Sequence, residues 1–215
     1  MPFSEWIKFD NSPITPHKAA FFDAETESDW AAAEYTKEEI QKIEAALKYL
    51  PSLEGQTVLE PGCGTGRLTC MLAARVGSKG RVLAMDISSK MVVSARKRLA
   101  GCRNVELACA PLEWICLPGG SVDTVFCHQV FPHFDDKSAA VALMARLLRP
   151  GGRFVILHLI GIEQINDIHR NAGTAVADDI MPATTALKRM LAEAHLNIEH
   201  LNDKPDGYLL AARKQ

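Results

Sequence analysis

The stretch Thr57-Val58-Leu59-Glu60-Pro61-Gly62-Cys63-Gly64-Thr65-Gly66 decides the fold of this chain. Its first residues predict the end of a buried strand, and the apolar residues within 68–72 predict a helix after it. Three glycines at alternate positions join the two elements. Because glycine accepts positive φ and lets a ligand approach the main chain closely, we expect a strand, a bare turn and a helix that bind a ligand together.

Asp86 lies twenty residues after the last of these glycines and follows a second apolar strand, predicted at 81–85. A carboxylate at that place can accept hydrogen bonds from both hydroxyls of a ribose. Similar turns hold a pyrophosphate in dinucleotide enzymes, but Glu60 would be badly placed beside a polyphosphate. The combination favours a ligand with a ribose, no phosphate and a cationic or amino-bearing end. S-adenosylmethionine is such a ligand.

At these residues the chain resembles the class I S-adenosylmethionine-dependent methyltransferases. Four blocks carry the resemblance, in the order and spacing of the family: 58–66, 84–88, 122–126 and 147–154. The resemblance covers about residues 35 to 213. It implies an enzyme that transfers the methyl group of S-adenosylmethionine to an acceptor, and we expect this acceptor to be a small molecule.

The resemblance also implies a set of cofactor-binding residues. Asp86 would hold the ribose, Glu60 would meet the ammonium group or brace the loop, and Ile87 with Met91 would pack on the adenine. The full expected set is Glu60, Gly62, Cys63, Gly64, Gly66, Asp86, Ile87, Met91, Ala110, Leu112 and Cys127. For Cys63 we expect packing and backbone contact, and no nucleophilic chemistry.

One feature of the family is missing after the third predicted strand. Many relatives carry an Asp there that accepts the adenine amino proton, whereas the stretch 108–113 has no carboxylate at that place. The backbone of Ala110 or Leu112, or the side chain of Glu113, is expected to substitute.

Strands and helices alternate along the chain. We predict strands at about 57–60, 81–85, 105–109, 122–127, 153–159, 197–201 and 208–213. We predict helices at about 37–50, 66–76, 88–99, 135–148 and 184–195. This alternation predicts an α/β fold with a doubly wound, seven-stranded, mostly parallel, Rossmann-like sheet. The closely spaced last pair predicts one antiparallel strand.

We divide the chain into an N-terminal arm, 1–35, and a methyltransferase domain, 36–215, with a substrate-lid insert at about 158–183. Aromatic residues of the arm favour burial, so we interpret it as a partly helical cap over the cofactor site, with a simple packing arm as the alternative. The acceptor pocket is expected to be apolar and to suit an aromatic or quinone-like acceptor. Its expected lining is Phe3, Trp6, Trp30 and Phe131.

Three histidines are candidates for catalysis: His128, His158 and His169. An imidazole titrates near neutral pH and can act as a general base. His128 follows the fourth predicted strand, and the other two belong to the insert. For His133, in the loop after His128, we favour a packing role.

A base pair or metal site is the alternative for the insert. His158 and His169 would then converge with Asp178 or Asp179, but these residues lack the tight spacing of zinc motifs, so we favour a capping and lid-packing role and predict no metal. The six cysteines are scattered without a Cys-x-x-Cys pair, which indicates buried thiols in a reducing compartment.

Composition excludes several functional classes. The formal net charge is −2 and no basic stripe is present, so we expect no nucleic-acid partner. No apolar run has the length of a membrane span and no leader pattern opens the chain, so we expect a cytoplasmic protein without membrane contact. A homodimer stays open. Two other functions also stay open: a nicotinamide-dependent reductase on a similar sheet, and a non-catalytic cofactor-binding regulator.

Overall fold

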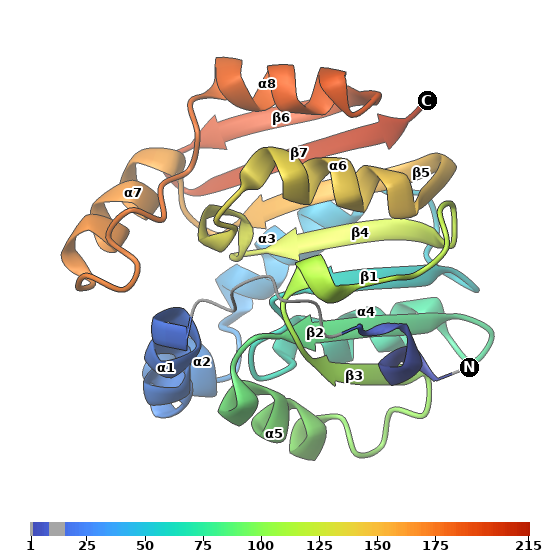
Figure 1. The fold of residues 1–215 in the computed structure, drawn as a ribbon, viewed down its shortest axis with the longest axis horizontal. Helices are drawn as coiled ribbons and strands as arrows, with labels where there is room; N and C mark the ends of the chain where they lie inside the picture. The colour runs from blue at the N-terminus through green and yellow to red at the C-terminus, as the bar shows by residue number, and fades with distance from the viewer. Residues whose placement is uncertain (1, 9–15) are drawn as a thin grey trace. The chain divides into compact units, whose positions relative to one another are not determined.

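The computed structural model describes residues 2–8 and 16–215 of the chain (Figure 1). Contacts between Cα atoms divide it into two compact units. The first comprises residues 1–36 and 52–118, and the second comprises residues 37–51 and 119–215. Residues 9–15 of the predicted arm, Phe9 and Pro13 among them, lie outside the described residues.

The first unit is built on three parallel strands, β1 (Thr57–Pro61), β2 (Arg81–Asp86) and β3 (Val105–Cys109), with β2 in the middle. Two helices connect them, α4 (Arg67–Val76) and α5 (Ser89–Arg98). Helix α4 packs on β1 and β2, and α5 packs on β2 and β3. Because helices cover the sheet, β2 is an unbroken run of buried residues after its first position, as expected of a parallel central strand.

The N-terminal segment belongs to this first unit and is partly helical, as predicted. Its elements are η1 (Phe3–Trp6), α1 (Pro16–Ala24), η2 (Glu25–Glu27) and α2 (Asp29–Ala32). A further short helix, η3 (Leu112–Trp114), follows β3.

The position of Phe3 differs from the expectation that this residue lines an acceptor pocket. Helix η1 packs on β3, as Figure 1 shows, and the Phe3 backbone nitrogen donates to a carboxylate oxygen of Glu106 at 2.5 Å. Glu106 is the second residue of β3, whereas ligands of such sheets bind at the carboxyl ends of the strands. Phe3 is only 2% exposed and therefore covers β3, which is an edge strand of the sheet.

The second unit is built on four strands, β4 (Val122–His128), β5 (Leu148–His158), β6 (Leu196–Lys204) and β7 (Gly207–Lys214). Its helices are α3 (Lys37–Leu47), η4 (Phe131–His133), α6 (Lys137–Leu147), α7 (Ile162–Asn171) and α8 (Thr184–Glu193). Strand β5 is parallel to β4, and β7 is antiparallel to both β5 and β6. Helix α6 packs on β5 and α8 on β6 (Figure 1).

The strands form a seven-stranded sheet in the order β3-β2-β1-β4-β5-β7-β6. The predicted α/β fold, with a doubly wound, mostly parallel sheet and one antiparallel strand, is confirmed. Among the helices of the described residues, none combines the length and the apolar character that crossing a membrane requires.

Strand β5 begins earlier than predicted. The turn residues 149–152 predict a start at about 153, but Leu148 already pairs with Val122. The register shifts between Val122 and Thr124, and Gly151 takes a φ of 78°. A bulge leaves a few residues of one strand unpaired while the residues on either side of them stay paired. The strand can therefore include residues 149–152, although their sequence is typical of a turn.

Candidate active site

The glycine turn between β1 and α4 has the backbone that its sequence predicts. Gly62, Gly64 and Gly66 have φ angles of 67°, 54° and 83°, in the region that favours glycine. A Cβ on Gly66 would lie 3.2 Å from the Cβ of Ala95 in α5, so this position also needs glycine for packing. A Cβ on Gly64 would meet no described atom within 4 Å. The space beside Gly64 therefore leaves the main chain open to a ligand.

Asp86 holds this turn in place from the end of β2. Its Oδ2 accepts a hydrogen bond from the Gly64 nitrogen at 2.8 Å, and its Oδ1 accepts one from the Ser88 nitrogen at 2.9 Å. Burial raises the pKa of the Asp86 carboxyl, and these backbone donors act in the opposite direction. Because a carboxylate has about four acceptor positions, Asp86 can take further donors, such as the two hydroxyls of a ribose.

Glu60 lies in β1 just before the turn and is only 2% exposed. Burial, and then the nearby Asp86 carboxylate, raise the pKa of Glu60 to about 8, against the opposing effect of the Thr69 hydroxyl. Within the described part of the chain, the Glu60 Oε2 atom has no hydrogen-bond partner. A buried carboxyl group with an unused oxygen suits a cationic partner, because binding of a cation would favour its ionised form.

Cys63 lies inside the turn and is buried. Its backbone nitrogen donates to the Met85 oxygen at 3.0 Å, which ties the turn to β2. Burial, and then the carboxylates of Asp86 and Glu60, raise the pKa of the Cys63 thiol well above its ordinary value. A protonated thiol is a poor nucleophile, in keeping with the packing role expected of this residue.

The residues expected around the adenine lie next to Asp86. Met91 and Leu112 are buried and Ile87 is half-buried, so these side chains give an apolar surface at the ends of β2 and β3. The Ala110 nitrogen donates to the Asp86 backbone oxygen at 2.9 Å. Because this bond uses the Ala110 nitrogen, that atom is a poor candidate for adenine recognition. Glu113 is exposed.

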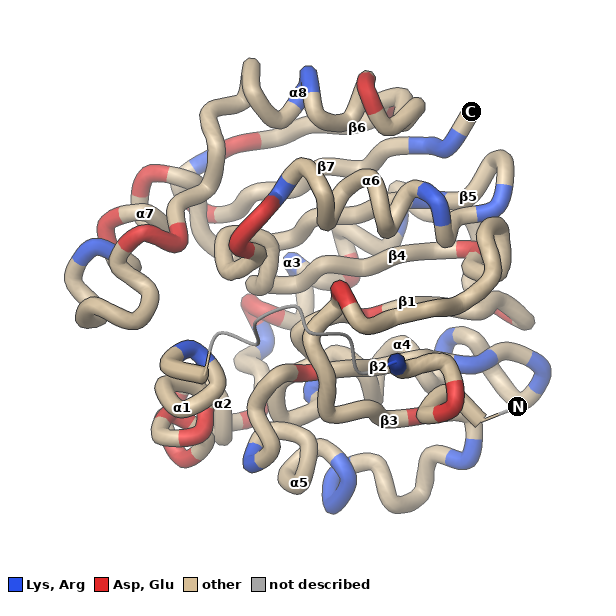
Figure 2. Tube along the Cα trace, in the orientation of Figure 1, with Lys and Arg blue, Asp and Glu red and all other residues tan. Residues whose placement is uncertain are grey.

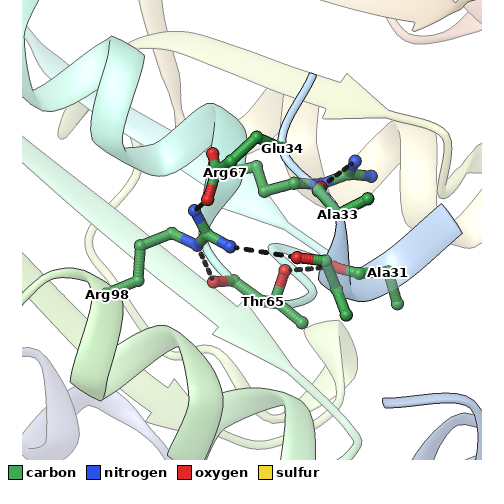
Figure 3. A network of polar contacts seen from close by, with 7 residues as sticks. Ala31, Ala33, Glu34, Thr65, Arg67 and Arg98 are labelled. Carbon is green, nitrogen blue, oxygen red and sulfur yellow. Dashed lines mark hydrogen bonds and ion pairs between the residues drawn. The ribbon is translucent and has the colours of Figure 1, made fainter. Parts of the chain in front are cut away.

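A polar network ties the N-terminal segment to the glycine turn (Figure 3). The Thr65 hydroxyl donates to the Ala31 oxygen at 2.6 Å, and an Arg67 guanidinium nitrogen donates to the Ala33 oxygen at 2.9 Å. Arg98, the last residue of α5, donates to the Thr65 oxygen at 3.1 Å and pairs with the Glu34 carboxylate. Thr65 therefore bonds to the N-terminal segment through Ala31 and to helix α5 through Arg98.

Asp23 of α1 makes a second connection to the same region. Its carboxylate accepts hydrogen bonds from the Ser88 hydroxyl at 2.5 Å and from the Lys90 nitrogen at 3.0 Å. These donors lie at the N-terminus of α5, where a negative charge is favourable because of the helix dipole. The N-terminal segment therefore braces both the glycine turn and the helix that follows Asp86.

We expect Arg98→Met to loosen this connection while leaving the sheet intact. Loss of the hydrogen bond to Thr65 and the ion pair with Glu34 removes about 1–2 kcal/mol of local stability, since both involve a charged group. Hydrogen exchange of the backbone amides of α2 should become about 5- to 30-fold faster. Lys97→Met, at an exposed position of the same helix, is the matched control and should leave these rates unchanged.

Histidines gather in the second unit. His128 and His158 are the last residues of the parallel strands β4 and β5, and both are buried. The His133 Nδ1 lies 2.7 Å from a carboxylate oxygen of Asp179, and the His169 Nδ1 contacts the backbone oxygen of Asp179. The rings of His133 and His169 have their centroids 4.7 Å apart. The insert thus meets the loop after β4 through Asp179.

The pair of His133 and Asp179 was not anticipated from the sequence, where a packing role is favoured for His133. The two residues are 46 positions apart and no local spacing connects them. Asp178, the other candidate acid, is exposed. Among residues 2–8 and 16–215, no group of three or more His, Cys, Asp or Glu side chains is arranged to hold a metal ion.

Cys127, in β4, is the one expected cofactor-binding residue that belongs to the second unit. Its side chain is fully buried, and its sulfur lies 3.6 Å from the sulfur of Met144 in α6. The thiol therefore packs against a helix, and a contact of Cys127 with the cofactor stays a prediction.

Comparison with known proteins agrees with this geometry. Residues 59–156 match the methyltransferase domain family. The ubiquinone/menaquinone biosynthesis C-methyltransferase UbiE of Enterobacter sp. (strain 638) is 30% identical over 174 residues, which cover 69% of each chain. A SAM-dependent methyltransferase from Aquifex aeolicus has the same fold, with a TM-score of 0.68, 22% identity and coverage of 97% of this chain and 100% of the other.

The fold is also that of a geranyl diphosphate methyltransferase solved with GPP and sinefungin, with a TM-score of 0.76, 14% identity and coverage of 95% and 100%. The match spans only 32% to 43% of the length of other curated relatives, among them UbiE of Francisella philomiragia. The similarity to the Enterobacter protein nevertheless extends over most of both sequences. The chain therefore belongs to the class I S-adenosylmethionine-dependent methyltransferases, whose cofactor is S-adenosylmethionine.

Proposed function

We propose that this protein transfers the methyl group of S-adenosylmethionine to a small-molecule acceptor. The observation that carries the proposal is the bare turn at Gly64, bonded to Asp86 and preceded by the buried Glu60 with an unused oxygen. These groups fit a ligand that has a ribose and an ammonium group and no phosphate. S-adenosylmethionine, when bound, supplies an electrophilic methyl group on a sulfonium that is a good leaving group.

Each part of the cofactor would contact different residues at the glycine turn and at the end of β2. Asp86 would accept both ribose hydroxyls, and Glu60 would meet the ammonium group as a carboxylate. The main chain beside Gly64 would lie against the methionyl part, and Ile87 with Met91 would cover the adenine. The protein would thus bind and align, and it would exclude water from the reacting groups.

An uncharged aromatic or quinone-like acceptor is favoured. Relatives of this chain carry the name ubiquinone/menaquinone biosynthesis C-methyltransferase, which supports such an acceptor. Charge also supports it: the insert exposes the acidic residues Glu163, Asp167 and Asp178 against the basic residue Arg170. Figure 2 shows acidic positions along α7 and the loop that follows it. An acidic surface repels anions, which disfavours a nucleic acid as acceptor.

His133 is the candidate general base of the reaction. An acceptor hydroxyl or an acidic carbon must lose a proton when it takes the methyl group, and His133 would accept this proton. Asp179 would be a positioning residue: its carboxylate, 2.7 Å from Nδ1, favours the tautomer with the proton on Nδ1, so that Nε2 carries the lone pair. The carboxylate would also stabilise the imidazolium once it forms.

Asp179→Asn is expected to lower kcat about 10- to 100-fold near neutral pH, because the amide cannot stabilise the imidazolium. Asp178→Asn, at the exposed neighbouring position, is the control. The Tm of Asp179→Asn should stay close to that of the wild-type protein. A purely structural role of Asp179 would instead lower Tm together with kcat.

The function can be tested with methyl-labelled S-adenosylmethionine and an organic extract of bacterial cells. Label should pass into an extractable product, and Asp86→Asn should lower the transfer about 100-fold or more when S-adenosylmethionine is far below saturation. Tight binding of NAD without binding of S-adenosylmethionine would instead support a nicotinamide-dependent reductase. Binding of S-adenosylmethionine with no transfer to any fraction would support a regulator.

We also place the protein in the cytoplasm. None of the six cysteines, all of them among the described residues, forms a disulfide, and Cys63 and Cys127 are buried. Cysteines without disulfides suit a reducing compartment.

A further inference from the structure

Two buried polar groups of the second unit stand side by side without partners. His158 ends β5 and pairs in register with Tyr208, near the start of β7, and their ring centroids are 6.4 Å apart. His158 is 4% exposed and Tyr208 is fully buried. Within the described residues, neither the His158 Nε2 nor the Tyr208 hydroxyl has a hydrogen-bond partner. Since burial of an unsatisfied polar group is unfavourable, the two groups together can take a hydrogen-bonding atom from outside the protein, either of a ligand or of a water.

Both groups are uncharged near neutral pH. Burial, and then the imidazoles of His128, His133 and His169, hold the pKa of His158 well below its ordinary value. Burial raises the pKa of Tyr208, and the charge of Asp203 acts in the same direction. A neutral imidazole and a phenol can each donate or accept a hydrogen bond. Neither offers the fixed positive charge that a carboxylate or a phosphate would require.

The position of this pair is that of a substrate subsite. His158 lies at the carboxyl end of β5, where sheets of this kind bind their ligands, and the insert begins directly after it. The insert is fixed at its start by the Gly161 nitrogen, which donates to the Pro205 oxygen at 3.2 Å, and by the Ile162 nitrogen, which donates to the Asp203 carboxylate at 3.1 Å. The start of the insert is therefore held against the end of β6 and the turn that follows it.

We propose that His158 and Tyr208 form an acceptor subsite that binds one uncharged hydroxyl or carbonyl oxygen of the methyl acceptor. The inference rests on the proposed function and sharpens it, because it names the chemical group that the enzyme recognises. It also changes the expectation for His158. A buried, neutral imidazole of this kind is a weak base, so His158 holds the acceptor and leaves proton transfer to another residue.

Three naphthalenes of similar size test the subsite: 1-naphthol, 1-methylnaphthalene and 1-naphthoate. Calorimetric titration, with and without saturating S-adenosylhomocysteine, should show 1-naphthol binding at least tenfold more tightly than the other two. Tyr208→Phe should lower the affinity for 1-naphthol about 5- to 30-fold, because only the ring hydroxyl is removed. The affinity for 1-methylnaphthalene should change by less than about twofold. Tyr49→Phe removes a hydroxyl at a half-exposed position of the same unit and should change neither affinity.

Thermal unfolding of the ligand-free protein gives a second measurement. Removal of a hydroxyl that lacks a partner should leave Tm unchanged or raise it by about 2–4 °C. A fall in Tm would mean that the Tyr208 hydroxyl is permanently bonded, and it would contradict the proposal. Equal affinity for 1-naphthol and 1-methylnaphthalene, a preference for 1-naphthoate, an unchanged preference in Tyr208→Phe, or no binding of any probe would contradict it as well.

The failure of this subsite is distinguishable from the failure of the proposed function. Binding of S-adenosylhomocysteine and transfer of labelled methyl groups report on the function and do not depend on the naphthalene probes. If both succeed while the naphthol preference is absent, the protein is a methyltransferase with a different acceptor site. If the cofactor does not bind, the titrations without it still decide whether the subsite exists.

Discussion

Asp86→Asn is expected to weaken the binding of S-adenosylhomocysteine, the demethylated cofactor, by about 100-fold or more. Each charge-assisted hydrogen bond from a ribose hydroxyl to a carboxylate contributes about 1.5–3 kcal/mol, and Asp86 would accept two. Asn keeps the size of the side chain but only one acceptor oxygen. Because Gly64 and Ser88 donate to different oxygens of Asp86, the new amide nitrogen would also face one of these backbone donors.

Calorimetric titration with S-adenosylhomocysteine measures the loss, and Asp23→Asn separates its two causes. Asp23 caps the same helix, α5, through Ser88 and Lys90, so this control loosens the helix start without removing a ribose contact. We expect less than a fivefold change in the control. If both variants lose affinity equally, Asp86 acts through the helix start alone, and its assignment to the ribose is wrong.

Local signals explain why so much of the fold follows from the sequence. Ser88 is predicted to begin a helix, and its hydroxyl accepts a hydrogen bond from the Met91 nitrogen at 3.1 Å. Asp136 does the same for α6 through the Ala139 nitrogen at 2.9 Å. Caps, glycine turns and apolar periods are properties of a few consecutive residues, so they can be read without knowledge of the tertiary structure.

Contacts between distant residues explain what the sequence does not reveal. Arg98 reaches Glu34 over 64 positions, and the Asp23 carboxylate reaches Ser88 over 65. The sequence does not show which of its many charged residues form such pairs, because residues so far apart come together only when the helices and strands pack. The neutral pair of His158 and Tyr208 is hidden for the same reason: strand register alone brings a histidine of the predicted lid beside a tyrosine near the C-terminus.

The cofactor loop has one feature that the sequence predicts and, at a neighbouring position, one that it does not. The glycines are predicted because their conformation is a local requirement, and the structure gives all three a positive φ. The protonation of Glu60 is not predictable from its spacing, because it depends on burial by the whole first unit. From the sequence alone Glu60 reads as a carboxylate, whereas burial raises its pKa to about 8.

Glu60→Gln is therefore expected to change cofactor binding and stability in opposite directions. In the wild-type protein, Glu60 is largely protonated at pH 7 without ligand, and the ammonium group of the cofactor should drive it to ionise. Affinity for S-adenosylhomocysteine should then rise about 10- to 100-fold between pH 6 and pH 8, and binding at pH 7 should release about one proton. The variant has no proton to release, so its affinity should be lower at pH 8 and nearly independent of pH.

Stability should show the reverse effect. The unfolded chain ionises Glu60 near its ordinary value of 4.5, whereas the folded chain keeps the proton up to about pH 8. Between these values the unfolded state binds fewer protons, so the free energy of unfolding falls as pH rises, by about 3 kcal/mol at pH 7. Gln has no proton to release, so the Glu60→Gln variant does not lose this stability as pH rises. Urea unfolding at pH 5 and pH 8 should therefore show a stabilising effect of the variant that grows with pH.

Calorimetry in two buffers of different ionisation enthalpy measures the released proton, and Thr69→Val is the matched control because it changes the neighbouring hydroxyl and leaves the carboxyl group. This control should still release a proton. A wild-type affinity that is constant from pH 6 to pH 8 would mean that Glu60 does not meet the ammonium group. Glu60 would then serve only to brace the loop, although its burial would still make Glu60→Gln stabilising at pH 8. The two measurements together thus distinguish a carboxyl group that binds the cofactor from one that is merely buried beside it.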